Sequence, residues 1–192
     1  MDGRNELLHN KAELRKRLLS VRRDLADKPV LSRTACVKAA RLVRGNVMVY
    51  VSIGSELDTK PLIEILDRNG TDVFVPYTSS DGIITPMRLI KIGTPDRMGN
   101  LPSECLECVD KKIKMDYCVT PLLGFNPNGN RIGYGKGCYD RFFGKNETYK
   151  IGLAFSCQLV NFRAQPHDVP LDCCVTEQDV IYFNHASDCG KI

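Results

Sequence analysis

The 192-residue sequence has no long hydrophobic run, and this absence excludes a protein that crosses a membrane on helices. Its longest uninterrupted apolar segment is VMVYV at residues 47–51, whereas a membrane-spanning helix needs about 20 apolar residues. The opening residues, MDGRNELLHNK, also contain no apolar segment of the secretory type. We therefore expect a cytoplasmic protein that has no membrane partner.

Histidine is scarce, and the cysteines are scattered along the chain. The three histidines, His9, His167 and His185, form no triad-like group, and no G-x-S-x-G nucleophile motif is present. The nine cysteines include one C-x-x-C pair, Cys105 and Cys108, but a structural zinc site needs a second pair or two histidines at suitable spacing. The odd cysteine count and the missing secretory signal favour reduced thiols.

The composition is that of one globular domain covering residues 1–192. Hydrophobic residues make up 43% and charged residues 26% of the chain, which is too apolar for a disordered protein. A chain of this length can bury a full core without disulfides or metals. The net charge of +4 is compatible with an anionic small ligand but selects none. The final residues, 184–192, are predicted to form a frayed tail.

Three helices are predicted in the first seventy residues. A stripe of apolar residues at helical spacing predicts a helix over 6–26, made of Leu14, Leu18, Val21 and Leu25. Ser32 is a suitable cap for a second helix that runs through Arg44, and Thr59 for a short third helix that ends near Gly70.

Strand-like segments alternate with these helices. Residues 81–104 suggest a hairpin-like excursion, and strands are predicted at 47–52, 72–77, 116–123, 150–156 and within 174–183. This alternation predicts an α/β fold with a mainly parallel central sheet.

The segment that follows the third strand of this parallel set carries the most information. Residues 124–143 read GFNPNGNRIGYGKGCYDRFF and hold five glycines, with Arg131 and Lys136 among them and Asp140 at the start of a predicted helix. Backbone N–H groups of a glycine loop and of a helix start bind phosphate, and the two cations can neutralise its oxygens. The carboxylate of Asp140 is a suitable Mg²⁺ ligand. The alternative is a flexible surface turn.

The common nucleotide-binding motifs do not fit this glycine loop. A P-loop requires glycine where Asn130 stands and Ser or Thr where Gly137 stands. The dinucleotide-binding and protein-kinase glycine patterns both fail at Cys138.

Basic and acidic residues elsewhere are further candidates. Lys11 and Arg15 lie on one face of the first helix, although the pattern alone favours a solvated basic face. Glu56 and Asp58 follow a strand end, where α/β sheets place ligands. Glu56 is the candidate for a polar ligand contact, and Asp58 is expected to make a local turn or cap hydrogen bond.

The loop before the last strand region contains His167, Asp168 and Asp172. Such a loop is often only a surface connection. Asp172 is a candidate for a second carboxylate on the same metal ion.

The string GNRIGYGKGCYDRFF, preceded by TPLLGFN, closely resembles the glycine loop of the 5-formyltetrahydrofolate cyclo-ligase family, also called methenyltetrahydrofolate synthetases. Four more segments are similar to that family and follow its order: K-x-x-L-R (11–15), YVSIGSELDT (50–59), GLAFSCQ (152–158) and HDVPLDCCVTEQ (167–178). The resemblance extends from about Lys11 to Val180, which is nearly the whole chain.

The resemblance implies a three-layer α/β sandwich and an activity. Members of the family convert 5-formyltetrahydrofolate to 5,10-methenyltetrahydrofolate with MgATP and release ADP and phosphate. The formyl oxygen attacks the γ-phosphate to give a phosphorylated imidate, the second nitrogen of the folate closes the ring, and phosphate leaves. Polyglutamylated folates are possible substrates, and we expect a monomer.

The resemblance also implies roles for particular residues. The ATP-binding set is Lys11, Arg15, Arg131, Ile132, Gly133, Tyr134, Gly135, Lys136, Gly137, Cys138 and Tyr139. The folate-binding set is Val51, Glu56, Tyr134, Gly135, Lys136, Gly137 and Cys138. The Mg²⁺ ligands are Asp140 and Asp172.

The sequence departs from the family at Cys138, where the family usually has an aromatic residue. This change puts folate affinity in question more than the reaction type. Two other classes remain open. One is a binding relative that contacts RNA through the basic first helix, although no aromatic platform supports a nucleic-acid partner. The other is a sugar-phosphate isomerase or transferase of similar architecture, which needs no ATP.

Overall fold

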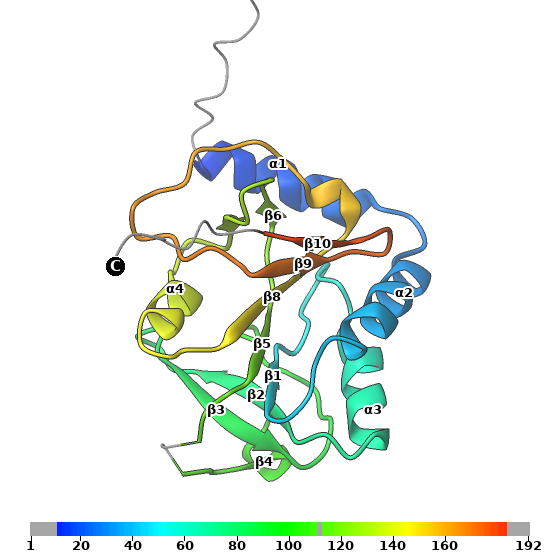
Figure 1. Cartoon of the computed structure of the whole chain (residues 1–192), viewed down its shortest axis with the longest axis vertical. Coiled ribbons are helices and arrows are strands. Elements are labelled where there is room, and N and C mark those ends of the chain that lie inside the picture. The colour runs from blue at the N-terminus through cyan, green and yellow to red at the C-terminus, as the bar shows by residue number, and fades with distance from the viewer. Residues whose placement is uncertain (1–10, 111–112, 184–192) are drawn as a thin grey trace, which may run out of the picture.

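The computed structural model describes residues 11–110 and 113–183 (Figure 1). The predicted helical residues 6–10, the tail 184–192 and two of the histidines, His9 and His185, lie outside this part of the chain. Within it, no helix combines the length and apolarity that a membrane crossing requires.

Helices and strands alternate along the described chain as predicted. The α-helices are α1 (Lys11–Asp24), α2 (Lys28–Ala40), α3 (Lys60–Arg68) and α4 (Cys138–Phe143). The strands are β1 (Val47–Val49), β2 (Val73–Thr78), β3 (Ile84–Leu89), β4 (Leu106–Glu107), β5 (Tyr117–Thr120), β6 (Gly124–Phe125), β7 (Arg131–Ile132), β8 (Tyr149–Leu153), β9 (Cys173–Val175) and β10 (Val180–Tyr182). Two short 3₁₀ helices are η1 (Ser103–Cys105) and η2 (Ser156–Gln158).

Eight of these strands form one sheet with the order β10-β9-β8-β5-β1-β2-β3-β4. The central pairs from β9 to β2 are parallel, and the pairs at both edges are antiparallel. The predicted α/β fold with a mainly parallel sheet is therefore confirmed. The hairpin-like excursion at 81–104 is also confirmed in part, since β3 folds back on β2.

Alternating side chains of β1 show how the sheet separates two helical layers. Val47 and Val49 pack with residues of α2 and α3, whereas Met48 between them packs with the aromatic residues of α4. Successive strand residues point to opposite faces of a sheet, so α2 and α3 cover one face and α4 the other (Figure 1). This is the expected three-layer arrangement.

The prediction that Ser32 caps the second helix was wrong. The helix begins four residues earlier at Lys28, because Pro29 is suited to a first turn and Asp27 before it takes a left-handed conformation. Ser32 is buried inside α2, and its Oγ accepts a hydrogen bond from the Asp58 N–H at 3.1 Å. The helix also ends at Ala40 rather than Arg44.

Two other predicted boundaries need refinement. Thr59 occupies the N-cap position of α3, but its hydroxyl donates to the Tyr50 carbonyl instead of capping. Asp58 makes the local contact predicted for it, because its Oδ1 accepts from the Lys60 N–H at 3.0 Å. The last predicted segment, 174–183, contains the end of β9 and the antiparallel strand β10.

Candidate functional site

A cavity of about 410 Å³ lies beyond the carboxyl ends of the central strands β1 and β5. The chain leaves β1 toward β2 on one side, while β5 pairs with β1 on the other side. Such a reversal of strand order leaves a crevice at which α/β proteins bind ligands. The walls come from α1, the turn after β1, the glycine loop, the turn at 97–99 and the segment 165–168.

The glycine loop is held by a small antiparallel hairpin, β6–β7, and then runs into α4. At the hairpin tip, the side-chain oxygen of Asn126 accepts hydrogen bonds from the N–H groups of Asn128 and Asn130 at 3.0 and 2.9 Å. Gly137 precedes α4 with φ of +63°, a conformation that glycine adopts without strain. All seven residues from Arg131 to Gly137 line the cavity, and so do Cys138, Tyr139 and Asp140.

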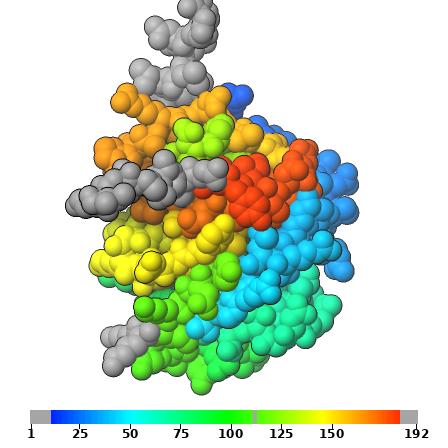
Figure 2. All heavy atoms as spheres, viewed as in Figure 1, coloured from blue at the N-terminus to red at the C-terminus, as the bar shows by residue number. Residues whose placement is uncertain are grey.

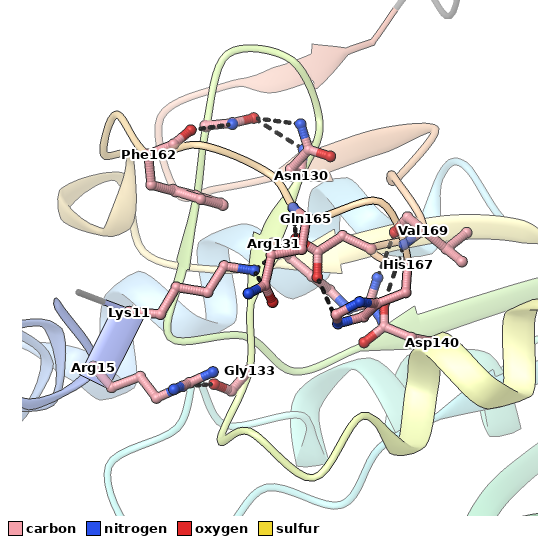
Figure 3. Close-up of polar contacts among 12 residues, drawn as sticks. Lys11, Arg15, Asn130, Arg131, Gly133, Asp140, Phe162, Gln165, His167 and Val169 are labelled. Atoms are coloured by element: carbon pink, nitrogen blue, oxygen red, sulfur yellow. Dashed lines mark hydrogen bonds and ion pairs between the residues drawn. The ribbon is translucent and has the colours of Figure 1, made fainter. Parts of the chain in front are cut away.

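Arg131 and Asp140 are brought together at the start of α4 (Figure 3). Arg131 Nη2 donates to Asp140 Oδ1 at 2.9 Å, and its Nη1 donates to the Val169 carbonyl at 2.7 Å. The guanidinium also lies 5.0 Å from the ring centre of Phe143. Burial lowers the pKa of Arg131, and the charge of Asp140 opposes this effect.

Lys11 and Arg15 also reach the cavity, so the solvated face that pattern alone favoured is wrong for this pair. Lys11 Nζ lies 2.7 Å from Asp168 Oδ2, and Arg15 Nε donates to the Gly133 carbonyl at 2.9 Å. Both side chains project from α1 toward the glycine loop (Figure 3). Their neighbours Lys16 and Arg17 are exposed.

Asp168 belongs to a segment that lies against the start of α1, as the space-filling view shows (Figure 2). Burial alone would raise the pKa of Asp168, but hydrogen bonds from the Gln165 N–H and from Lys11 hold that pKa below its usual range. This end of the cavity therefore contains two cations, Lys11 and Arg15, beside backbone N–H groups of the glycine loop.

Glu56 also lines the cavity, in the turn after β1. Its side chain is largely buried, and Oε2 accepts a hydrogen bond from the Ile53 N–H at 2.9 Å. Burial raises the pKa of Glu56, while the Ile53 N–H, the charge of Arg22 and a hydrogen bond from Tyr134 counteract part of that rise. Val51 lines the cavity nearby and is half-buried.

Arg22 is not among the predicted site residues, yet it is 1% exposed and lies behind the cavity wall, where it contacts Tyr134. The spacing of α1 could have indicated that Arg22 is buried, because Leu14, Leu18 and Arg22 follow one another at intervals of four residues. The structure buries all three. Val21, which was assigned to the apolar stripe, is instead exposed. A basic residue on a buried helical stripe indicates a charge with an internal partner.

Comparison with known proteins now identifies the family of this fold and cavity. A profile described as the 5-formyltetrahydrofolate cyclo-ligase family matches residues 8–177. The chain belongs to that family. It is 33% identical over 154 residues to the 5-formyltetrahydrofolate cyclo-ligase of Escherichia coli, with 70% of this chain and 79% of the relative covered. A probable cyclo-ligase of Caenorhabditis elegans is 31% identical over 155 residues, with 71% and 74% covered.

Two solved structures share the fold of this cyclo-ligase family member. The 5,10-methenyltetrahydrofolate synthetase of Mycoplasma pneumoniae matches with a TM-score of 0.68 and 27% identity, covering 88% of this chain and 99% of its own. The synthetase of Aquifex aeolicus matches with a TM-score of 0.73 and 25% identity, covering 94% and 96%.

Cys138, the residue that departs from the family pattern, is half-buried at the start of α4 and lines the cavity. Its Sγ lies 3.9 Å from Arg141 Nη2. Arg141 in turn donates to the carbonyls of Lys136 and Gly82 at 2.8 and 3.0 Å. The cysteine thus sits between the cavity and an anchored guanidinium.

Asp172 is not brought to Asp140. It lies just before β9, where its Oδ2 accepts from the Lys150 N–H at 2.6 Å and pairs with Lys150 Nζ at 2.8 Å. The described residues that line the cavity do not include Asp172. Its carboxylate joins the starts of β8 and β9, at the end of the strands opposite to the cavity.

The described residues contain no group of three His, Cys, Asp or Glu side chains that could hold a metal ion. Beside nucleotides, Mg²⁺ is usually bound by one or two carboxylates together with substrate phosphates. Asp140 fits that mode because it lines the cavity beside the glycine loop.

Proposed function

We propose that the protein converts 5-formyltetrahydrofolate to 5,10-methenyltetrahydrofolate and consumes MgATP in doing so. The observation that supports this proposal best is a single cavity with two chemically different ends. One end offers Lys11, Arg15 and glycine-loop N–H groups, which suit a triphosphate. The other end offers Glu56 and Tyr134, which suit a flat ligand with hydrogen-bond donors.

The reaction needs a better leaving group than the formyl oxygen. Attack of that oxygen on the γ-phosphorus forms an O–P bond and releases ADP, and the second folate nitrogen then attacks the activated carbon. The attacking nitrogen gives up its proton to water, the C–O bond breaks, and phosphate leaves. Placing the two substrates end to end in one cavity supplies the proximity that the first step requires.

In the proposed reaction, the protein's own residues bind and orient the two substrates. Lys11 and Arg15 bind the triphosphate, with Lys136 as a further cation at the rim of the cavity. The N–H groups of the glycine loop face the oxygens on which charge accumulates. Glu56 accepts hydrogen bonds from the pterin and fixes the folate relative to the nucleotide.

Asp140 would hold Mg²⁺ together with the phosphates, and the ion would neutralise charge on the transferred phosphoryl group. Asp172 is given no part in the proposed reaction, because its carboxylate is paired with Lys150 at the other end of the strands. The contact between Asp140 and Arg131 fixes the carboxylate at the start of α4.

A direct assay tests the proposed function. The protein is mixed with 5-formyltetrahydrofolate and MgATP, and the near-ultraviolet absorbance of the methenyl product is followed while ADP is measured in parallel. We expect product and ADP in equal amounts and no product when ATP or Mg²⁺ is omitted. Product formed without ATP would contradict the mechanism, and failure to form product with both substrates would contradict the activity.

A further inference from the structure

Arg22 lies directly behind the folate end of the cavity and contacts three different segments. Its Nη2 donates to the Tyr134 hydroxyl at 2.6 Å, and its Nη1 donates to the Leu122 carbonyl at 3.1 Å. Its Nε donates to Ser55 Oγ at 3.2 Å. A single buried guanidinium thus connects the glycine loop, the end of β5 and the turn after β1.

The contact with Tyr134 reaches a half-exposed side chain of the cavity wall. Tyr134 is 49% exposed although it belongs to the cavity wall. Besides the hydrogen bond, the Arg22 guanidinium lies 5.8 Å from the centre of the Tyr134 ring. The ring is therefore held from behind by an anchored cation.

Arg22 also acts on Glu56 through charge. The groups that face Glu56 are Arg22 from α1, Tyr134 from the glycine loop, Tyr50 from the end of β1 and Tyr139 from α4. Among them only Arg22 is a cation. The Tyr134 hydroxyl lies within hydrogen-bonding reach of both Arg22 and Glu56. The three side chains therefore form a continuous row of contacts from helix α1 to the cavity.

We propose that Arg22 is a positioning residue for folate binding, which holds Tyr134 in the cavity wall and supplies the counter-charge for Glu56. This inference rests on the proposed function, since the bound molecule is taken to be 5-formyltetrahydrofolate. Arg22 itself does not line the cavity. Its influence therefore passes through the two residues that do, and it bears on the folate end rather than on the cations at the nucleotide end.

The first test compares Arg22→Met with Arg23→Met, a matched change at the exposed neighbouring arginine. Methionine keeps an apolar stem of similar length but removes the guanidinium. For Arg22→Met we expect the KM and the calorimetric Kd of 5-formyltetrahydrofolate to rise by about ten-fold or more, while the KM of ATP changes by less than about two-fold. Arg23→Met should leave all three constants unchanged. Equal changes in the folate and ATP constants would overturn the proposal.

A double-mutant cycle tests whether Arg22 acts through Tyr134. Tyr134→Phe removes only the hydroxyl that Arg22 contacts, at an exposed side chain. If Arg22 works through that hydroxyl, the combined variant binds folate little worse than Arg22→Met alone. If the two changes weaken folate binding independently, so that their fold-effects multiply in the double variant, then Arg22 does not act through the Tyr134 hydroxyl and this part of the proposal is refuted. Should Arg22→Met fail to fold by circular dichroism, Arg22→Lys replaces it in the cycle, because lysine keeps the charge but loses the fork geometry.

The pH dependence gives a readout that a purely structural role would not change. Arg22 is the one cation among the described groups that face Glu56, and its loss raises the pKa of the Glu56 carboxyl. As the pH is lowered, folate affinity in Arg22→Met should therefore begin to fall at a higher pH than in the wild type. Arg22→Lys should restore the wild-type profile. An unchanged pH profile of folate affinity in Arg22→Met would refute the proposed charge effect of Arg22 on Glu56. A wild-type protein that binds no 5-formyltetrahydrofolate would refute the proposed function together with this inference, whereas an active wild type with an unaffected Arg22→Met variant would refute the inference alone.

Discussion

The Asp140 carboxylate accepts two hydrogen bonds at one oxygen: Oδ1 lies 2.9 Å from Arg131 Nη2 and 3.2 Å from the Val169 nitrogen. This arrangement ties the first turn of α4 to β7 and to the segment that ends the cavity wall. Arg131 is thereby committed to a carboxylate and a carbonyl inside the protein. It shapes the cavity wall in addition to any contact it makes with phosphate.

Asp140→Asn is expected to lower turnover sharply and to leave the fold intact. Asparagine keeps an oxygen that can accept from Arg131 and Val169, but it removes the negative charge that a hard cation requires. Turnover measured over a range of Mg²⁺ concentrations checks this role, with circular dichroism as the control for folding. Near wild-type turnover at limiting Mg²⁺ would show that Asp140 is not a metal ligand.

The double variant Lys11→Ala, Arg15→Ala is expected to raise the KM of ATP. Each change would remove one of the proposed charge-assisted phosphate contacts, which are worth about 1.5–3 kcal/mol each. Lys11→Ala also removes the ammonium group that pairs with the Asp168 carboxylate at this end of the cavity. The matched control is Lys16→Ala, Arg17→Ala, two exposed positions on the same helix. Similar ATP constants for the two double variants would mean that the first pair does not bind the nucleotide.

Cys138→Tyr is expected to tighten 5-formyltetrahydrofolate binding several-fold with little change in the KM of ATP. An aromatic ring at this cavity position can cover the flat substrate, and such packing is worth about 0.5–1.5 kcal/mol beyond burial. Steady-state constants for both substrates check this expectation. Weaker folate binding in the variant would show that Arg141, 3.9 Å from the sulfur, already occupies the space.

Glu56→Gln is expected to stabilise the protein at neutral pH while it weakens folate binding. The pKa of Glu56 is raised in the folded state, chiefly by burial, whereas an unfolded glutamate titrates near 4.5. Its stability contribution is therefore complete below that value and is lost as the pH rises through the folded pKa. Urea unfolding of both proteins should give a larger free energy for Glu56→Gln at neutral pH. The difference should vanish below about pH 4.5, and a difference that persists there would show that titration is not its cause.

Gly129→Ala is expected to destabilise the fold more than Gly54→Ala. Both glycines have positive φ, at +81° and +59°, which costs an L-residue about 1–2 kcal/mol. A Cβ at position 129 would also lie 2.9 Å from the Leu171 carbonyl oxygen and 2.8 Å from the Phe183 ring, whereas position 54 has nothing within 4 Å. Overpacking should add about 1–3 kcal/mol. Equal unfolding free energies for the two variants would contradict the close approach.

Local patterns predicted the fold better than they predicted the boundaries of its elements. The central strands could be recognised because β1 is apolar and buried throughout, and β5 is largely apolar and buried. Ser32 was misread because a serine hydroxyl satisfies a distant backbone group as readily as its own helix start. No local pattern reveals a partner 26 residues away.

The same limit applies to the site: residues grouped in one segment could be predicted, whereas contacts between distant segments could not. The glycine loop could be recognised because its five glycines, two cations and one carboxylate lie in one short stretch of sequence. The spacing of Arg22 from Leu18 indicated its burial, but its partner Tyr134, 112 positions away, could not be inferred from the sequence. The spacing of carboxylates likewise could not place Asp172, which is paired with Lys150 in a neighbouring strand.

The contact between Lys11 and Asp168 joins positions 157 residues apart. This separation sets the order in which parts of the cavity can form while the chain is being synthesised on the ribosome. Helix α1 is synthesised first, yet Leu14 and Leu18 have no hydrophobic cover until Leu123 and Ile132 have been added. The end of the cavity that contains Lys11 is completed later still, when Asp168 has been added. A nascent chain that stops short thus exposes an uncovered basic helix to proteases and chaperones, and catalytic competence is acquired only near the completion of translation.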